Sequence, residues 1–144
     1  MVLIDTNILL NSVNRDSFHH EESRDCLDAV ANGSERWCMT WSIMYEFLRV
    51  ATHPRVFQRP LDLNKAHSFL SNLFESNTFC FLSETDEHQM VLRTCLNELP
   101  RLQGNILHDL HIAVIMREHA VEDIITRDKD FRLFSWINNR IEET

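Results

Sequence analysis

An α/β fold with a mostly parallel central sheet of four to five strands is predicted by three features of the sequence. Short apolar stretches of strand length alternate with longer stretches whose apolar residues recur at helical spacing. Glycine and proline are scarce, with 2 and 3 residues, which disfavours turn-rich all-β folds. The chain has 144 residues and 44% of them are hydrophobic, so it suits one domain, residues 1–144, with a single core.

The start of the chain predicts a strand that passes directly into a helix. Residues 2–4 are β-branched or otherwise apolar, as a buried parallel strand requires. Residues 5–7, an Asp, a Thr and an Asn, are types typical of helix N-caps, so a helix is expected directly after them. A second helix is expected over 19–31, with apolar residues on one face, and Gly33 follows its end.

The middle of the chain repeats the alternation of strand and helix. Residues 36–40 are the second predicted strand. Ser42 is expected to cap a helix that ends shortly before Pro54, because the residue before a proline is pushed out of the helical region. Asp62 is expected to cap the next helix, and residues 78–82 are the third predicted strand.

The last third of the chain completes the predicted sheet. A helix is expected over 85–99, and the helix over 105–119 should be the most strongly buried, because its apolar run over 112–116 leaves it little polar surface. Residues 123–126 form the fourth predicted strand, and 135–141 are expected to add a short last strand. Because helices separate these strands, their connections are long enough for parallel pairing.

Charge and cysteine usage limit the classes of function. The net charge of −8 is the wrong overall sign for a protein that grips nucleic acid by bulk electrostatics. No segment is apolar for long enough to span a membrane, and the charge at Asp5 interrupts the apolar start, so no signal peptide is expected. A cytoplasmic protein with reduced thiols is therefore predicted. Its cysteines, none of them in C-x-x-C spacing, are Cys26, Cys38, Cys80 and Cys95.

Four carboxylates are expected to meet at one edge of the sheet. Asp5 follows the first predicted strand and Asp128 follows the fourth, and ligands of open α/β sheets bind beyond the carboxyl ends of the strands. Asp109 lies in the first turns of the helix expected to be most buried, and Glu46 lies in the helix after the second strand. Each has apolar neighbours in sequence, and a carboxylate in such surroundings needs a partner, a raised pKa or a metal ion.

The chemistry of an all-carboxylate cluster points to a hard divalent cation. All-oxygen ligands favour Mg²⁺ or Mn²⁺ over zinc. One or two such ions suit the in-line hydrolysis of a phosphodiester. His108 and His111 are a weaker metal pair, because no third His and no Cys is patterned with them.

Each acid taken alone also has a simpler interpretation. Asp5 could cap the first helix, and Asp109 could be a first-turn acid that interacts with the helix dipole. Glu46 could be a solvated helix residue, and Asp128 could belong to a turn. Only their joint placement near one end of the sheet favours a shared site.

Four segments around these acids resemble the motifs of PIN-domain nucleases, in family order and over nearly the whole chain. They are 2–10 (VLIDTNILL), 45–50 (YEFLRV), 108–113 (HDLHIA) and 125–131 (ITRDKDF). A closer likeness, through residues 47–57 and 130–134, is to VapC-type toxins of bacterial toxin–antitoxin pairs. Four motifs in order are far more specific than any one of them.

The resemblance implies a PIN fold, Mg²⁺- or Mn²⁺-dependent endoribonuclease activity, a homodimer and inhibition by a cognate antitoxin. Thr6 and Asn7 would hold the first acid in place, and Asp130 is a candidate fifth metal ligand. The catalytic and metal-binding acids would be Asp5, Glu46, Asp109 and Asp128.

Positive charge is grouped in two places despite the acidic total. Any one of these side chains alone is best interpreted as a solvated surface residue, but placed around the carboxylates they could hold RNA phosphates while the acids hold metal. The candidates for RNA contact are Arg49, Arg55, Arg127, Lys129 and Arg132.

Other functions remain open from the sequence alone. A PIN-like module could bind RNA or a partner protein without catalysis. A Mg²⁺-binding phosphoacceptor domain is a weaker rival, because it needs a pair of adjacent early acids and a late lysine. A dehalogenase-like phosphatase needs a second Asp at the position where this chain has Asn7.

Overall fold

A five-stranded sheet forms the centre of the computed structural model, which describes residues 1–141 of the chain. All its strand pairs are parallel, in the order β3-β2-β1-β4-β5, so the predicted sheet is confirmed. The strands are β1 (Val2–Ile4), β2 (Trp37–Thr40), β3 (Phe79–Leu82), β4 (Asp123–Ile125) and β5 (Asn138–Asn139).

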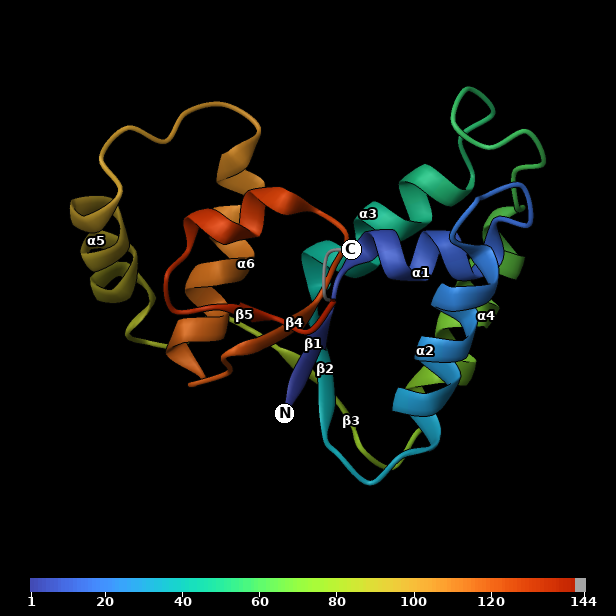
Figure 1. Ribbon diagram of the computed structural model, residues 1–144, viewed down its shortest axis with the longest axis horizontal. Coiled ribbons are helices and arrows are strands. Elements are labelled where there is room, and N and C mark those ends of the chain that lie inside the picture. The colour runs from blue at the N-terminus through green and yellow to red at the C-terminus, as the bar shows by residue number, and fades with distance from the viewer. Residues whose placement is uncertain (142–144) are drawn as a thin grey trace.

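Helices cover both faces of this sheet. Figure 1 shows α1, α2 and α4 on one side, and α5 and α6 on the other. No described helix is both long enough and apolar enough to cross a membrane. The helices are α1 (Thr6–Val13), α2 (His20–Asn32), α3 (Trp41–Ala51), α4 (Leu63–Phe74), α5 (His88–Glu98), α6 (Ile106–Glu118) and the 3₁₀ helix η1 (Lys129–Leu133).

The core lies where the central strands meet the flanking helices. All three residues of β1 are fully buried, as expected for the middle strand of a sheet covered on both faces. Five consecutive residues of α6, 112–116, are buried, which confirms it as the most strongly buried of the described helices. The four cysteines are free thiols, and Cys38 and Cys95 are buried in the core.

The strand order places the ends of β1 and β4 together. The chain leaves β1 for β2 and β3 on one side and returns to pair β4 on the other side, with Ile4 opposite Ile125. The amide of Asp5 continues this pairing, because it donates to the carbonyl of Ile125 over 3.2 Å. This reversal of direction next to β1 is the topological switch point at which open α/β sheets bind ligands.

Two predicted helix starts were wrong by a few residues. Thr40, not Ser42, is the N-cap of α3, because the extended backbone at the end of β2 lets its Oγ1 accept from the amide of Ile43. Helix α5 begins at His88, not at residue 85. The Thr85 hydroxyl instead donates to Glu118, and this contact holds the segment before α5 in a turn.

Candidate active site

Asp5 ends β1 and caps α1, and its carboxylate is held by three hydrogen bonds. Its Oδ1 accepts from the amide of Thr6 over 2.8 Å. Its Oδ2 accepts from the Thr126 hydroxyl over 2.7 Å and from the Asn7 side-chain amide over 3.1 Å. The side chain is 5% exposed, so these donors fix one orientation of a nearly buried acid. Asp5 therefore caps α1 and also lies at the candidate site, so the two roles that the sequence left as alternatives are compatible in one residue.

Thr126 connects the ends of β4 and β1, and sequence reasoning did not single it out. This fully buried hydroxyl donates to Asp5 and accepts from the Asn7 side chain and from the amide of Asp128. Asn7 in turn accepts from the amide of Arg127 through its Oδ1. The only signal in the sequence is a hydroxyl residue placed between the apolar fourth strand and Asp128.

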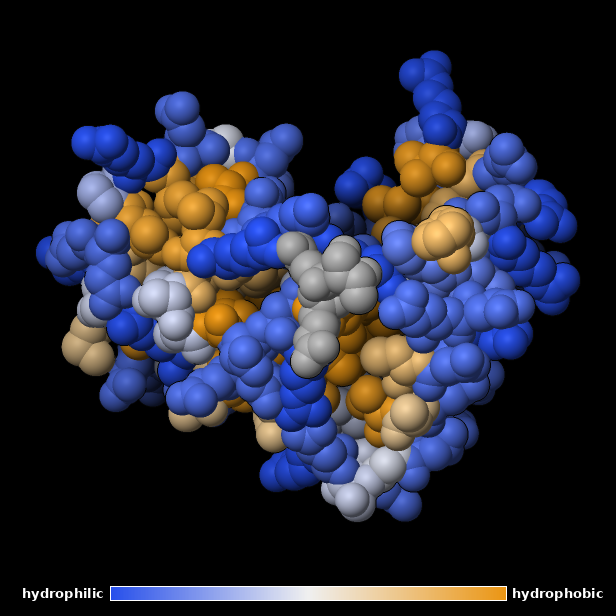
Figure 2. Space-filling model, viewed as in Figure 1, coloured by the Kyte–Doolittle hydropathy of each residue, from blue (hydrophilic) through white to orange (hydrophobic). Residues whose placement is uncertain are grey.

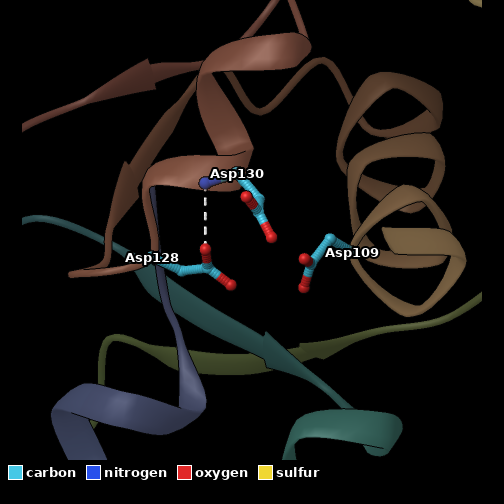
Figure 3. A group of neighbouring side chains, drawn as sticks. All are labelled: Asp109, Asp128 and Asp130. Carbon is cyan, nitrogen blue, oxygen red and sulfur yellow. Dashed lines mark hydrogen bonds between the residues drawn. The ribbon is translucent and has the colours of Figure 1, made fainter. Parts of the chain in front are cut away.

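Three carboxylates form the tightest acidic group among residues 1–141. One oxygen from each of Asp109, Asp128 and Asp130 lies within 4.8 Å of the others. Figure 3 shows their carboxylates directed towards a common space, Asp109 from α6 and the other two from the start of η1. The amide of Asp130 donates to Oδ1 of Asp128 over 2.9 Å, so the turn of η1 brings both side chains to the same place.

Burial, together with repulsion among the acids, raises two pKa values. Burial is the largest cause that raises the pKa of Asp109 to about 7, and the charges of Asp128, Asp5, Asp130 and Glu46 add to it. Burial also raises the pKa of Asp5 to about 6, against the opposing effect of its hydrogen bonds from Thr126 and Thr6. No hydrogen bond to the Asp109 carboxylate is found among the described residues. A divalent cation would relieve this repulsion, so the donor set fits Mg²⁺ or Mn²⁺.

Glu46 reaches the site from α3, and its surroundings are not apolar as the sequence suggested. It is exposed, and its neighbour Tyr45 is 67% exposed, because this face of α3 points away from the core. The hydroxyl of Thr6 donates to Oε2 of Glu46 over 3.1 Å. Thr6 therefore links Glu46 to Asp5, which accepts from its amide, although neither acid belongs to the tight group of three.

A cleft of roughly 740 Å³ connects the carboxylates with the surface. The α3 wall presents one helical stripe at i, i+3, i+4 and i+7, namely Ser42, Tyr45, Glu46 and Arg49. The α6 wall includes His108 and Asp109, and Asp128 and Asp130 complete the lining. Figure 2 shows the molecule hollowed between the side that carries α5 and α6 and the side that carries α1 to α4.

The basic side chains proposed for RNA contact are placed very differently from one another. Arg49 lines the cleft. Arg127 follows Thr126 but turns back to pair with Glu22 of α2 over 2.7 Å. Arg55, Lys129 and Arg132 are not among the cleft-lining residues. His111 also lines the cleft, and it hydrogen-bonds Glu84 rather than pairing with His108.

The sequence of the chain matches the PIN domain family over residues 2–136. The chain belongs to the PIN domain family. This confirms the resemblance found in the four motifs, and the sheet with carboxylates at the ends of β1 and β4 is its structural counterpart.

Curated relatives of this PIN domain match nearly end to end. The protein named Ribonuclease VapC37 from Mycobacterium tuberculosis is 29% identical over 137 residues, which cover 95% of this chain and 94% of the relative. Ribonuclease VapC48 from the same species is 25% identical over 136 residues, which cover 94% and 93%.

Solved structures confirm the fold. A crystal structure of VapBC2 from Rickettsia felis, bound to a DNA fragment from its promoter, contains a chain that superposes with a TM-score of 0.66. Its sequence identity is 16%, with 97% of this chain and 98% of that chain covered. The sarcin-ricin loop cleaving toxin VapC20 of Mycobacterium tuberculosis superposes with a TM-score of 0.64 at 12% identity, covering 95% and 97%.

Proposed function

We propose that this PIN domain, residues 1–144, is a Mg²⁺- or Mn²⁺-dependent endoribonuclease and the toxin of a toxin–antitoxin pair. The observation that carries the proposal is the group of three carboxylates, Asp109, Asp128 and Asp130, next to the buried Asp5. The full-length likeness to relatives named ribonucleases supports RNA as the substrate. The cytoplasmic location predicted from the sequence stays a prediction.

The residues of the site have distinct roles in this proposal. Asp109 and Asp128 would hold the ion from opposite walls of the cleft, and Asp130 would support them from the first turn of η1. Asp5 would contribute negative charge close to Asp109, and Glu46 lines the same cleft from α3. A bound divalent ion would supply the charge that stabilises an oxygen of the scissile phosphodiester.

Supporting residues decide whether these acids stay in place. Thr6 and Asn7 donate to Glu46 and Asp5, and Thr126 donates to Asp5 from the neighbouring strand. Such donors orient carboxylates that would otherwise turn away from one another. The acids themselves repel RNA phosphates, so a bound cation would also strengthen substrate binding.

The proposed activity is tested with purified protein and RNA. Cleavage is measured with Mg²⁺, with Mn²⁺ and with excess chelator, and the cut ends are mapped by primer extension. Internal cleavage that needs the ion and is lost in Asp109→Asn is expected. Cleavage that persists in chelator at the full rate would overturn the metal mechanism. Binding of RNA without cleavage under every condition would favour the non-catalytic module instead.

A cognate antitoxin is the proposed partner. An acidic cleft of this kind attracts a peptide that carries Arg or Lys, and a guanidinium pairs well with carboxylates. Co-expression with the product of the neighbouring gene should yield a complex that does not cleave RNA. A complex that retains full nuclease activity would contradict this placement of the antitoxin. The predicted homodimer stays a prediction, which sedimentation of the isolated protein can test.

A further inference from the structure

The α3 wall of the cleft carries two side chains that have no role in holding the acids. Tyr45 and Arg49 lie four residues apart on α3, so they project from the same face about one helical turn from each other. Both line the cleft on either side of Glu46 in the sequence. A large aromatic ring and a guanidinium beside a phosphodiester-cleaving centre are the groups that proteins use for bases and phosphates.

The ring of Tyr45 is largely exposed and stacks on no other ring among the described residues. It is 67% exposed, and within residues 1–141 it forms no ring contact and no hydrogen bond. Trp41, one turn earlier on the same helix, is different because it stacks on Phe81 with ring centroids 3.8 Å apart and planes 5° apart. One face of Trp41 is therefore already covered, whereas Tyr45 can accept a nucleobase.

Arg49 is the one lysine or arginine among the described residues that line the cleft, and its guanidinium forms no ion pair within residues 1–141. Other arginines of the chain, such as Arg117 and Arg140, are paired with acids over 2.6–2.8 Å. An exposed, unpaired guanidinium at the rim of an acidic cleft offsets the repulsion that phosphates meet there, and its fork of donors fits phosphate oxygens.

We propose that Tyr45 and Arg49 form the strand-binding edge of the active site. Tyr45 stacks on a base of single-stranded RNA, and Arg49 holds a phosphate of the same strand. The substrate class is unpaired RNA, because a base must leave its helix before it can lie on a tyrosine ring. This proposal rests on the nuclease function proposed above and adds how the strand is held.

Steady-state kinetics test the stacking role. Base–aromatic stacking is worth about 1–3 kcal/mol, so Tyr45→Ala should raise KM for single-stranded RNA by about 5- to 140-fold. The value of kcat should change little, because the carboxylates are untouched. Tyr45→Phe keeps the ring and should restore most of the KM. Phe18→Ala removes an even more exposed ring outside the cleft and is the control.

The salt dependence of RNA binding tests Arg49. A phosphate contact to a single strand contributes about 0.7 to the slope of log K against log salt concentration. Arg49→Gln should lower the slope by about this amount, whereas Arg93→Gln, at an exposed position of α5 outside the cleft, should leave it unchanged. An equal slope in both variants would overturn the phosphate contact.

A spectroscopic readout separates this proposal from the nuclease function. Tyr45 is the single tyrosine of the chain, so 3-fluorotyrosine labelling gives one ¹⁹F resonance from the cleft. In chelator, homopolymeric single-stranded oligoribonucleotides of each base should shift that resonance. An oligomer of abasic riboses should not.

The outcomes of the two assays are distinguishable. If the wild-type protein cleaves RNA but Tyr45→Ala keeps its KM and no RNA shifts the resonance, the strand-binding edge is refuted and the nuclease function stands. If RNA shifts the resonance but is never cleaved, the nuclease function fails and the stacking contact stands. A resonance that responds to the antitoxin and to no RNA would assign Tyr45 to the partner protein and refute the proposal.

Discussion

Asp109→Asn should make the metal-free protein more stable while it removes the activity. The pKa of Asp109 rises from 3.8 to about 7 in the folded protein, mainly through burial and then through the charges of the other acids. A difference of this size corresponds to about 4 kcal/mol, which solvent screening of this half-buried carboxylate reduces to about 2 kcal/mol. Asparagine removes the charge, and no hydrogen bond to the Asp109 carboxylate is lost among the described residues.

The sign of the pH dependence follows from the direction of the shift. The folded wild type holds the Asp109 proton more tightly than the unfolded chain does. The stability that the wild type gains from this protonated carboxyl is therefore complete below about pH 4 and is lost as the pH rises through 7. In chelator at about pH 8, Asp109→Asn should therefore melt about 6 °C above the wild type. At about pH 5 the gain should fall below half of this value.

Thermal unfolding in chelator, followed by circular dichroism at both pH values, measures the effect. Asp25→Asn, at an exposed carboxylate of α2 outside the cleft, should leave the melting temperature nearly unchanged. With saturating Mg²⁺ the wild type should instead melt above Asp109→Asn, since it keeps the metal ligand that the variant lacks. Two results would refute the explanation that the charge of Asp109 destabilises the metal-free protein. One is a variant that melts below the wild type in chelator, and the other is an equal gain in melting temperature at both pH values.

Three further results are expected. Mg²⁺ or Mn²⁺ should raise the melting temperature of the wild type, as ligands of the folded state do, and a titration in which neither ion has any effect would contradict the proposed site. Asp128→Asn should lose nearly all cleavage, whereas Asp130→Asn should keep measurable cleavage and need about 10–100-fold more metal; the reverse order in a Mn²⁺ titration would exchange their roles. Thr126→Val should lower stability by about 1–3 kcal/mol and reduce cleavage, because Asp5 loses a buried donor, and Thr126→Ser should restore both in denaturant unfolding and cleavage assays.

The sequence predicted the sheet well because its strands carry strong local signals. The run Val2–Ile4 has no polar side chain, and an acid follows it directly, so both the strand and its functional end could be recognised. The starts of α3 and α5 were less predictable. Ser42 and Thr85 are both acceptable caps by residue type, and only the direction in which the preceding chain leaves the sheet decides which residue caps the helix.

The sequence by itself determined the fold family and the main acids of the candidate site, since each acid follows or lies within an element with a clear hydrophobic pattern. The tertiary structure decided which side chains meet. It placed Thr126 between the ends of β1 and β4, turned Arg127 back to Glu22, and left Tyr45 and Arg49 open to the cleft. The reason is physical: the hydrophobic pattern fixes which face of an element is buried, whereas the partner of a polar side chain comes from distant segments whose approach the local sequence does not specify.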